Sequence, residues 1–181
     1  MLEFVLKGGP LMWPILFCSV AALTLALKKW AAYRAVDRKL SAPAGDIARA
    51  ETGPMIALVR ALRRGADERE LSLVGTRQVR ELERGLGLLS LISVITPILG
   101  LTGTVTGMIQ TFQSISSLGS AVDPALLASG IWEALITTAA GLLVAIPAHV
   151  AYHLLDERLG EITQRMKEVT FELQKETPRG I

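Results

Sequence analysis

Two long apolar runs joined by a short polar stretch limit what this chain can fold into more than any other feature. Residues 86–115 and 126–155 form the runs, and residues 116–125 between them include Gly119, Asp123 and Pro124. Each run exceeds the roughly 20 residues that a helix needs to cross a bilayer core of about 30 Å. Because the connection is so short, the pattern predicts an antiparallel hairpin of two membrane-spanning helices.

A third apolar run, at residues 10–27, extends this prediction to a polytopic, all-α membrane protein. Half of the 181 residues are hydrophobic and only 5% are aromatic. The net charge of +2 is too small to indicate a nucleic-acid partner. The single cysteine, Cys18, lies inside the first run, which excludes a disulfide framework and a metal site of the cysteine-cluster type.

The basic residues predict the orientation of the spans. Few charges precede the first run and Lys28 and Lys29 follow it, so we expect a retained span and no cleaved signal peptide. By the positive-inside rule, the end after Leu27 is cytoplasmic and the N-terminus lies outside. The predicted order is an outer segment at 1–9, a span at 10–27, a cytoplasmic helical region at 28–85, a span at 86–115, an outer turn at 116–125, a span at 126–155 and a cytoplasmic helix at 156–181.

Helical patterns are also expected in the cytoplasmic parts. Residues 55–64 read as a short amphipathic helix, and a helix from Leu71 is expected to continue without interruption into the second span. After residue 156 an apolar a/d pattern predicts packing on the 71–86 helix or on a neighbouring subunit. That pattern consists of Leu159, Ile162, Met166, Val169 and Leu173.

Polar and small residues inside the hairpin identify the candidate site. With the turn centred near residue 121, Thr104 is level with Thr138, deep in the membrane, and Glu133 is level with Ile109 in its outer half. The helical period places small or polar residues on one stripe of each helix. The stripe of the second span is Gly100, Thr104, Gly107 and Thr111, and that of the third is Glu133, Thr137, Ala140, Gly141, Val144 and Ala148.

Each of these residues has a structural interpretation as well as a functional one. Glycines in membrane helices commonly only permit close packing, and a threonine in a span commonly bonds its own helix backbone. Glu133 is different, because a charge at mid-bilayer costs roughly 2.5–3.5 kcal/mol and needs a partner or a water path. His149 and His153 stand four residues apart, as a metal pair would, but without a third ligand nearby an interfacial position is preferred.

At these residues the chain resembles the MotA/TolQ/ExbB proton-channel family, and within it the ExbB and TolQ branch. The first matching stretch is residues 96–108 (TPILGLTGTVTGM) with Phe112, and the second is residues 130–142 (GIWEALITTAAGL) with 145–148 (AIPA). Residues 8–15 (GGPLMWPI) are also typical of ExbB-like members. The outer segment of about nine residues is shorter than in some members.

The resemblance implies a ring, in the family thought to be a pentamer, around the spans of an ExbD/TolR-like partner that carries a membrane aspartate. It implies that Thr104, Thr138 and Glu133 belong to the proton pathway. It further implies the bacterial inner membrane, and a TonB-like or TolA-like protein as the component that is energised. No cofactor or metal is expected.

Two other functions stay open at this point. A non-conducting oligomeric scaffold would use the stripes for packing alone, and the stator of another envelope device, for gliding or secretion, would use the same channel differently. An intramembrane enzyme is disfavoured, because no Ser/His or paired-Asp set lies at one depth. The spans are compatible with sodium ions as well as protons. Arg80 and Arg84, near the inner mouth, are expected to bind anionic lipid headgroups or to set the depth of the helix.

Overall fold

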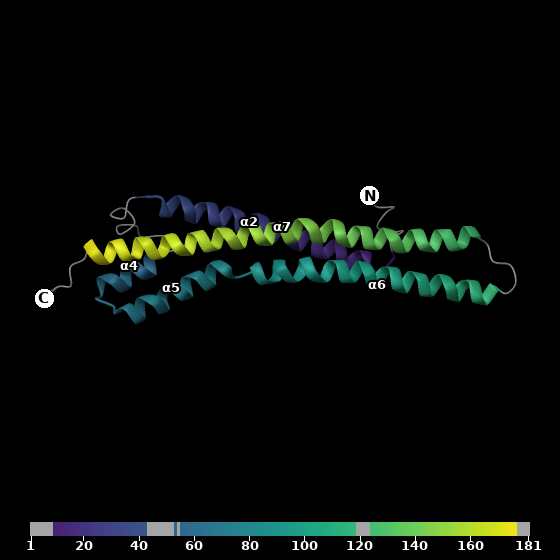
Figure 1. The fold of residues 1–181 in the computed structure, drawn as a ribbon, viewed down its shortest axis with the longest axis horizontal. Helices are drawn as coiled ribbons and strands as arrows, with labels where there is room; N and C mark the ends of the chain where they lie inside the picture. Colours follow the sequence, from purple (N-terminus) through teal and green to yellow (C-terminus); the bar gives the residue numbers. More distant parts are fainter. Residues whose placement is uncertain (1–8, 43–52, 54, 119–123, 177–181) are drawn as a thin grey trace. The chain divides into compact units, whose positions relative to one another are not determined.

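The computed structural model describes residues 9–42, 53, 55–118 and 124–176, and every regular element among them is a helix (Figure 1). The helices in chain order are α2 (Met12–Leu40), α4 (Ile56–Arg63), α5 (Glu68–Glu83), α6 (Leu86–Leu118) and α7 (Pro124–Glu176). Within this part of the chain, three helical stretches are long and apolar enough to cross a membrane: Met12–Leu40, Glu68–Ser117 and Leu127–Lys175. The all-α fold with three candidate spans is therefore confirmed. Most of the predicted outer segment and the middle of the predicted outer turn lie outside the described residues.

The chain divides into two compact units. The span unit comprises Met1–Ala26 and Leu88–Tyr152, and the charged unit comprises Leu27–Gly87 and His153–Ile181. Helices α2 and α7 contribute residues to both. The units are described separately below.

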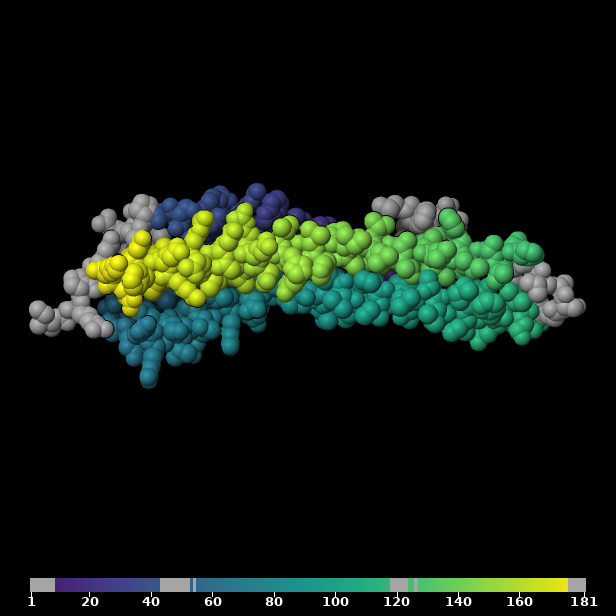
Figure 2. Space-filling view, in the orientation of Figure 1, coloured from purple at the N-terminus to yellow at the C-terminus, as the bar shows by residue number. Residues whose placement is uncertain are grey.

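In the span unit, α6 and the first part of α7 lie side by side (Figure 1). Their atoms meet along the face shown in Figure 2, where α6 is teal and α7 is green. Both helices continue through an internal proline, Pro97 in α6 and Pro147 in α7. Large apolar side chains remain exposed on the outer faces, as expected of helices whose solvent is lipid. They include Ile98, Leu101, Val105, Phe112, Leu135, Leu143 and Ile146.

The predicted continuous helix from Leu71 into the second span is wrong. Helix α5 ends at Glu83, and α6 begins at Leu86. Between them Arg84 adopts ψ 116° and Gly85 adopts φ 100°. Glycine has no Cβ and adopts such a positive φ readily, whereas other residues are strained there. The charges across residues 80–84 predict a membrane boundary near Gly85. Because the helix also ends there, the charge pattern does not reveal the break.

Two side chains of α2 bind the end of α5 within the charged unit. Lys29 Nζ donates to the carbonyl oxygen of Leu82 at 2.7 Å, and the Tyr33 hydroxyl donates to the same oxygen at 2.9 Å. The last carbonyls of a helix lack intrahelical partners and form the negative end of its dipole. A lysine ammonium and a phenol therefore satisfy a carbonyl that the break at Gly85 leaves unpaired. At the other end of α5, the Asp67 side chain caps the helix by accepting from Glu70 N at 2.8 Å.

The C-terminal part of α7 is held in the charged unit by its apolar stripe. Leu159, Ile162, Met166 and Leu173 are buried, and Val169 is half-buried. Arg165 Nη1 and Asp37 Oδ1 form an ion pair at 2.7 Å between α7 and α2. Helices α5 and α7 line a common groove, and packing of the stripe on a neighbouring subunit stays a prediction.

Gly85→Ala tests the break between α5 and α6. The substitution forces a Cβ onto a backbone with φ 100°, so we expect destabilisation of about 1 kcal/mol or more, seen as a lower thermal midpoint of the full chain in detergent. Gly87→Ala is the matched control, since nothing lies within 4 Å of a Cβ there and its φ is not positive. An equal midpoint for the two variants would contradict the assignment of the break to Gly85.

Candidate functional site

Close contact between α6 and α7 depends on glycines that face the opposite helix. A Cβ atom on Gly100 would lie 3.0 Å from Thr138 Cα, and one on Gly141 would lie 2.8 Å from the carbonyl oxygen of Thr96. Small residues at such an interface let two membrane helices approach closely. We call this contact the glycine seam. Its glycines are Gly100, Gly103, Gly107, Gly130 and Gly141.

The threonines of the glycine seam are engaged in hydrogen bonds. Thr138 Oγ1 donates across it to the carbonyl oxygen of Gly100 at 2.8 Å. Thr111 Oγ1 donates within its own helix to Gly107 at 2.8 Å, and Thr137 Oγ1 donates to Glu133 at 3.2 Å. Thr111 and Thr137 are buried. Thr138 therefore joins the two helices, whereas the hydroxyls of Thr111 and Thr137 are satisfied within their own helices.

Glu133 borders a cavity of about 300 Å³ beside the glycine seam. Its carboxylate comes from α7, and hydroxyl and amide groups come from α6. Gly9 lies beside the carboxylate, since a Cβ atom on Gly9 would be 3.3 Å from Glu133 Oε1. The lining residues are Gly9, Pro10, Leu11, Thr102, Gly103, Thr106, Gly107, Gln110, Glu133, Ala134 and Thr137.

This cavity can hold water and a transferable proton. A carboxyl group gives and takes a proton, and hydroxyls and an amide both donate and accept hydrogen bonds. In a span such a group needs polar company, which this cavity supplies. The arrangement suits ion or proton passage better than covalent catalysis, which needs a nucleophile beside a base.

The predicted pathway residues do not all meet in one chain. Glu133 lines the cavity, whereas Thr104 and Thr138 are not among the residues found to line it. Thr104 is half-buried, and its hydroxyl donates to Leu101 of its own helix at 2.7 Å. On α6, Gly103 faces Thr137, and it was not among the predicted stripe residues. Predicted stripe residues Gly100, Gly107, Thr111, Thr137 and Gly141 do lie on the glycine seam.

Sequence reasoning missed the α6 residues that accompany Glu133. Thr102, Thr106 and Gln110 recur every four residues, which places them on one face of a helix. That spacing was readable in the sequence, but each threonine alone has a simpler structural explanation. Only the position of Glu133, which lines the same cavity from α7, indicates a common role for Thr102, Thr106 and Gln110.

Both histidines belong to α7, His149 in the span unit and His153 at the start of the charged unit's part of the helix. His149 Nδ1 lies 3.3 Å from Ser93 Oγ of α6. Over the described residues, no group of three or more His, Cys, Asp or Glu side chains is arranged to hold a metal ion. A histidine pair without such company gives no support for a metal centre.

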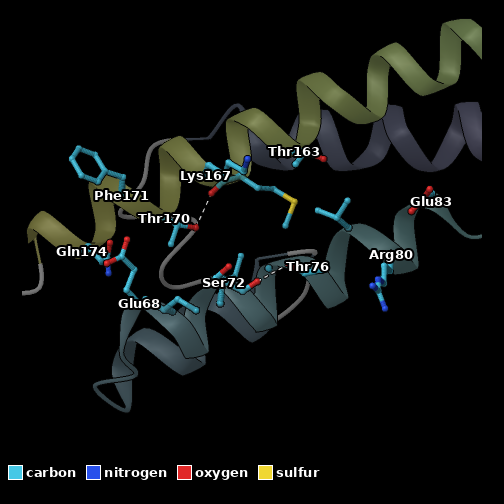
Figure 3. Close-up of a pocket in the computed structure, with 15 residues that line it drawn as sticks. Glu68, Ser72, Thr76, Arg80, Glu83, Thr163, Lys167, Thr170, Phe171 and Gln174 are labelled. Carbon is cyan, nitrogen blue, oxygen red and sulfur yellow. Dashed lines mark hydrogen bonds between the residues drawn. The ribbon is translucent and has the colours of Figure 1, made fainter.

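The charged unit carries a second, larger hollow. A groove of about 560 Å³ lies between α5 and α7 (Figure 3). Leu58, Leu71, Val79 and Met166 line its apolar part. Figure 3 shows polar side chains of both helices around it, among them Glu68, Arg80, Glu83 and Lys167.

A hairpin with a glycine seam, in a chain whose described residues include three candidate membrane spans, is typical of polytopic helical membrane proteins. Residues 37–168 match the model of the MotA/TolQ/ExbB proton channel family. That match covers most of the chain, and the chain belongs to this family.

Particular relatives point to the ExbB and TolQ branch. A putative biopolymer transport protein, ExbB-like 1, of Synechocystis is 35% identical over 178 residues, covering 86% of this chain and 70% of the relative. Biopolymer transport protein exbB1 of Vibrio cholerae is 46% identical over 43% of this chain. The Tol-Pal system protein TolQ of Haemophilus influenzae is 38% identical over 53% of it. The aligned parts are 34% of the Vibrio protein and 42% of the Haemophilus protein, so the chain spans less than half of either.

Gly141→Ala tests the glycine seam. The added methyl group would press on the Thr96 carbonyl and the Gly100 backbone, neither of which can rotate away. We expect a loss of about 1–3 kcal/mol, measured as a lower thermal midpoint and reduced recovery of the assembled protein. Gly160→Ala, in the same helix with nothing within 4 Å, should be neutral or slightly stabilising. If both variants behave alike, the close approach at Gly141 is not what holds the hairpin.

Proposed function

We propose that this chain is the ExbB/TolQ-like subunit of a proton-driven motor in the bacterial inner membrane. It forms a homo-oligomeric ring, a pentamer as the family resemblance implies. Its N-terminus lies outside and its C-terminus is cytoplasmic. An ExbD/TolR-like partner with one span and a membrane aspartate completes the proton channel. Proton flow then energises a TonB-like or TolA-like protein for outer-membrane transport or envelope maintenance.

The cavity at Glu133 is the observation that supports this proposal most. A carboxylate within a span, in a cavity that hydroxyl and amide groups also line, is expected for an ion path and is costly for a helix that only packs. Between residues 86 and 155 the acidic residues are Glu133 and Asp123, and Asp123 falls in the connection between the runs. A relay of two carboxylates across the membrane therefore requires a second chain, as the family's partner would supply.

A non-conducting scaffold is the second candidate, and the glycine seam favours it. Helix packing at the seam accounts for the presence of the glycines there, and hydrogen bonds to backbone carbonyls account for most of the seam's threonine hydroxyls. Neither requires transport. The scaffold does not explain why Glu133 shares a cavity with Thr106 and Gln110. A stator for gliding or secretion would share the channel and differ in the protein that it drives.

Glu133→Gln separates the channel from the scaffold. The amide keeps the size of the side chain but cannot carry a proton, so we expect partner-dependent proton uptake into vesicles to fall at least about tenfold, as for loss of an essential acid–base group. The vesicles contain the chain co-produced with the single-span, aspartate-bearing protein of the same genome. Imposing a sodium gradient in place of the proton gradient distinguishes the two ions.

Glu157→Gln is the matched control for this experiment. Glu157 is exposed in the charged unit and lies outside the predicted spans, so proton uptake should match the unaltered chain. Wild-type flux through Glu133→Gln would show that Glu133 is not part of the proton path. Absence of partner-dependent flux from the unaltered chain would leave the scaffold as the better description.

We also propose that Arg80 and Arg84 bind anionic headgroups at the inner membrane surface. Both side chains are exposed, and a basic residue at such a surface contributes about 1 kcal/mol. Added phosphatidylglycerol should raise the thermal midpoint of the detergent-solubilised chain, and Arg80→Glu with Arg84→Glu should abolish that rise. Lys175→Glu, near the end of α7, should retain it. A full response from the double variant would rule out this lipid contact.

A further inference from the structure

The carbonyl oxygen of Leu82, in the last turn of α5, accepts two hydrogen bonds from α2. Lys29 Nζ donates to it at 2.7 Å and the Tyr33 hydroxyl at 2.9 Å. Tyr33 is buried and Lys29 is half-buried. A carbonyl oxygen has two lone pairs, so these two donors use its full capacity to accept hydrogen bonds. We call Lys29, Tyr33 and the Leu82 carbonyl the carbonyl latch, and all three belong to the charged unit.

The same carbonyl would have a different partner in an uninterrupted helix. In an α-helix the N–H of each residue donates to the carbonyl four residues earlier, so the N–H of Leu86 would donate to Leu82. In the structure α5 ends at Glu83 and α6 begins at Leu86, and side chains of α2 occupy the Leu82 carbonyl. The α2 side chains and the Leu86 N–H are therefore competing donors for one acceptor.

Only two residues separate the broken junction from a continuous helix. These are Arg84, with ψ 116°, and Gly85, with φ 100°. Glutamate, arginine and leucine, which surround the glycine at residues 83, 84 and 86, have high helix propensity, and a single glycine is tolerated in a helix at modest cost. Joining the helices would also give up to four orphan carbonyls of α5 and four orphan N–H groups of α6 their partners. The local sequence is thus compatible with both states, and the bonds from α2 oppose the joined one.

The two donors are arranged to leave the carbonyl together. Lys29 and Tyr33 are four residues apart, so they lie on one face of α2, one turn from each other. A shift of α2 along its axis by one turn, about 5.4 Å, would carry both donors beyond hydrogen-bonding distance of Leu82. Because α2 contributes residues to both units, a displacement that begins in its span part reaches the latch along a single helix.

We propose that the carbonyl latch holds the α5–α6 junction in the broken state and that its release lets α5 and α6 join into one helix. With the latch closed, residues 84–85 form a joint between the charged unit and the span unit. With the latch open, α5 and α6 move as one rod and transmit motion between the units. This switch does not depend on which ion the protein conducts, or on whether it conducts one.

Hydrogen–deuterium exchange of the full chain in detergent tests the competition directly. Lys29→Met combined with Tyr33→Phe removes both donors and keeps most of the side-chain volume. The N–H groups of residues 86–89 stand at the start of α6, where they lack intrahelical partners, and they gain such partners in a joined helix. We therefore expect their exchange to slow at least about tenfold in the double variant. Lys28→Met is the matched control, since it removes an exposed charge one residue away and should leave the exchange unchanged.

A distance measurement within one chain tests the same change independently. In a Cys18→Ser background, spin labels are attached at Leu73→Cys on α5 and Leu91→Cys on α6, both of which are exposed positions. In one continuous helix these backbone positions are about 27 Å apart, at 1.5 Å per residue. The double variant should move the measured distribution to that separation, whereas the latch-intact protein and Lys28→Met should share a different one. Labelled chains are diluted with unlabelled chains, so that only distances within one copy are recorded.

The direction of the exchange effect separates a switch from a contact that only stabilises the fold. Faster exchange at residues 86–89 in the double variant would overturn the proposal, because the two hydrogen bonds would then only hold the structure together. Unchanged exchange, or slower exchange without the change in distance, would overturn it as well, because the break would then persist without α2. None of these results bears on ion passage, since neither measurement involves an ion gradient or a partner protein.

Discussion

The close contact of α6 with α7 is the constraint on which the rest of the span unit depends. A carbonyl oxygen of Thr96 and the backbone of Gly100 occupy the space that a side chain at residue 141 would need. In lipid, where apolar side chains gain little by leaving their solvent, packing of this kind must hold helices together. The glycines consequently fix both the separation of the helices and their register.

That register determines which polar groups are left for chemistry. Thr96, Thr111 and Thr137 donate to carbonyls of their own helices, and Thr138 donates across the glycine seam. These hydroxyls are thereby committed to structure. Glu133 and Gln110 lie at the edge, where they are exposed in a single chain and border a cavity. The polar side chains that are free of the seam therefore lie along a flank of the hairpin and not in its middle.

Much of this organisation could be predicted from the sequence, and the failures have physical reasons. Run lengths predict the helices of the three spans, and the unusual Glu133 identifies the site. The sequence does not decide which small residue of α6 meets α7, because steps of three and four alternate in a helix, so Gly103 and Thr104 fit a pattern built on Gly100 and Gly107 equally well. Only the position of Thr137 opposite Gly103 decides between them. The break at Gly85 was missed because an isolated glycine is also tolerated within helices, and its φ of 100° cannot be read from residue type.

The break at Gly85 makes possible a specific contact within the charged unit. A helix running without interruption from α5 into α6 would leave no unpaired carbonyl at Leu82 for Lys29 and Tyr33 to bind. With the break, α5 is fixed at its end by α2 and at its start by the Asp67 cap. Its position is thus set by contacts within the charged unit, and α6 can take the register that the glycine seam requires.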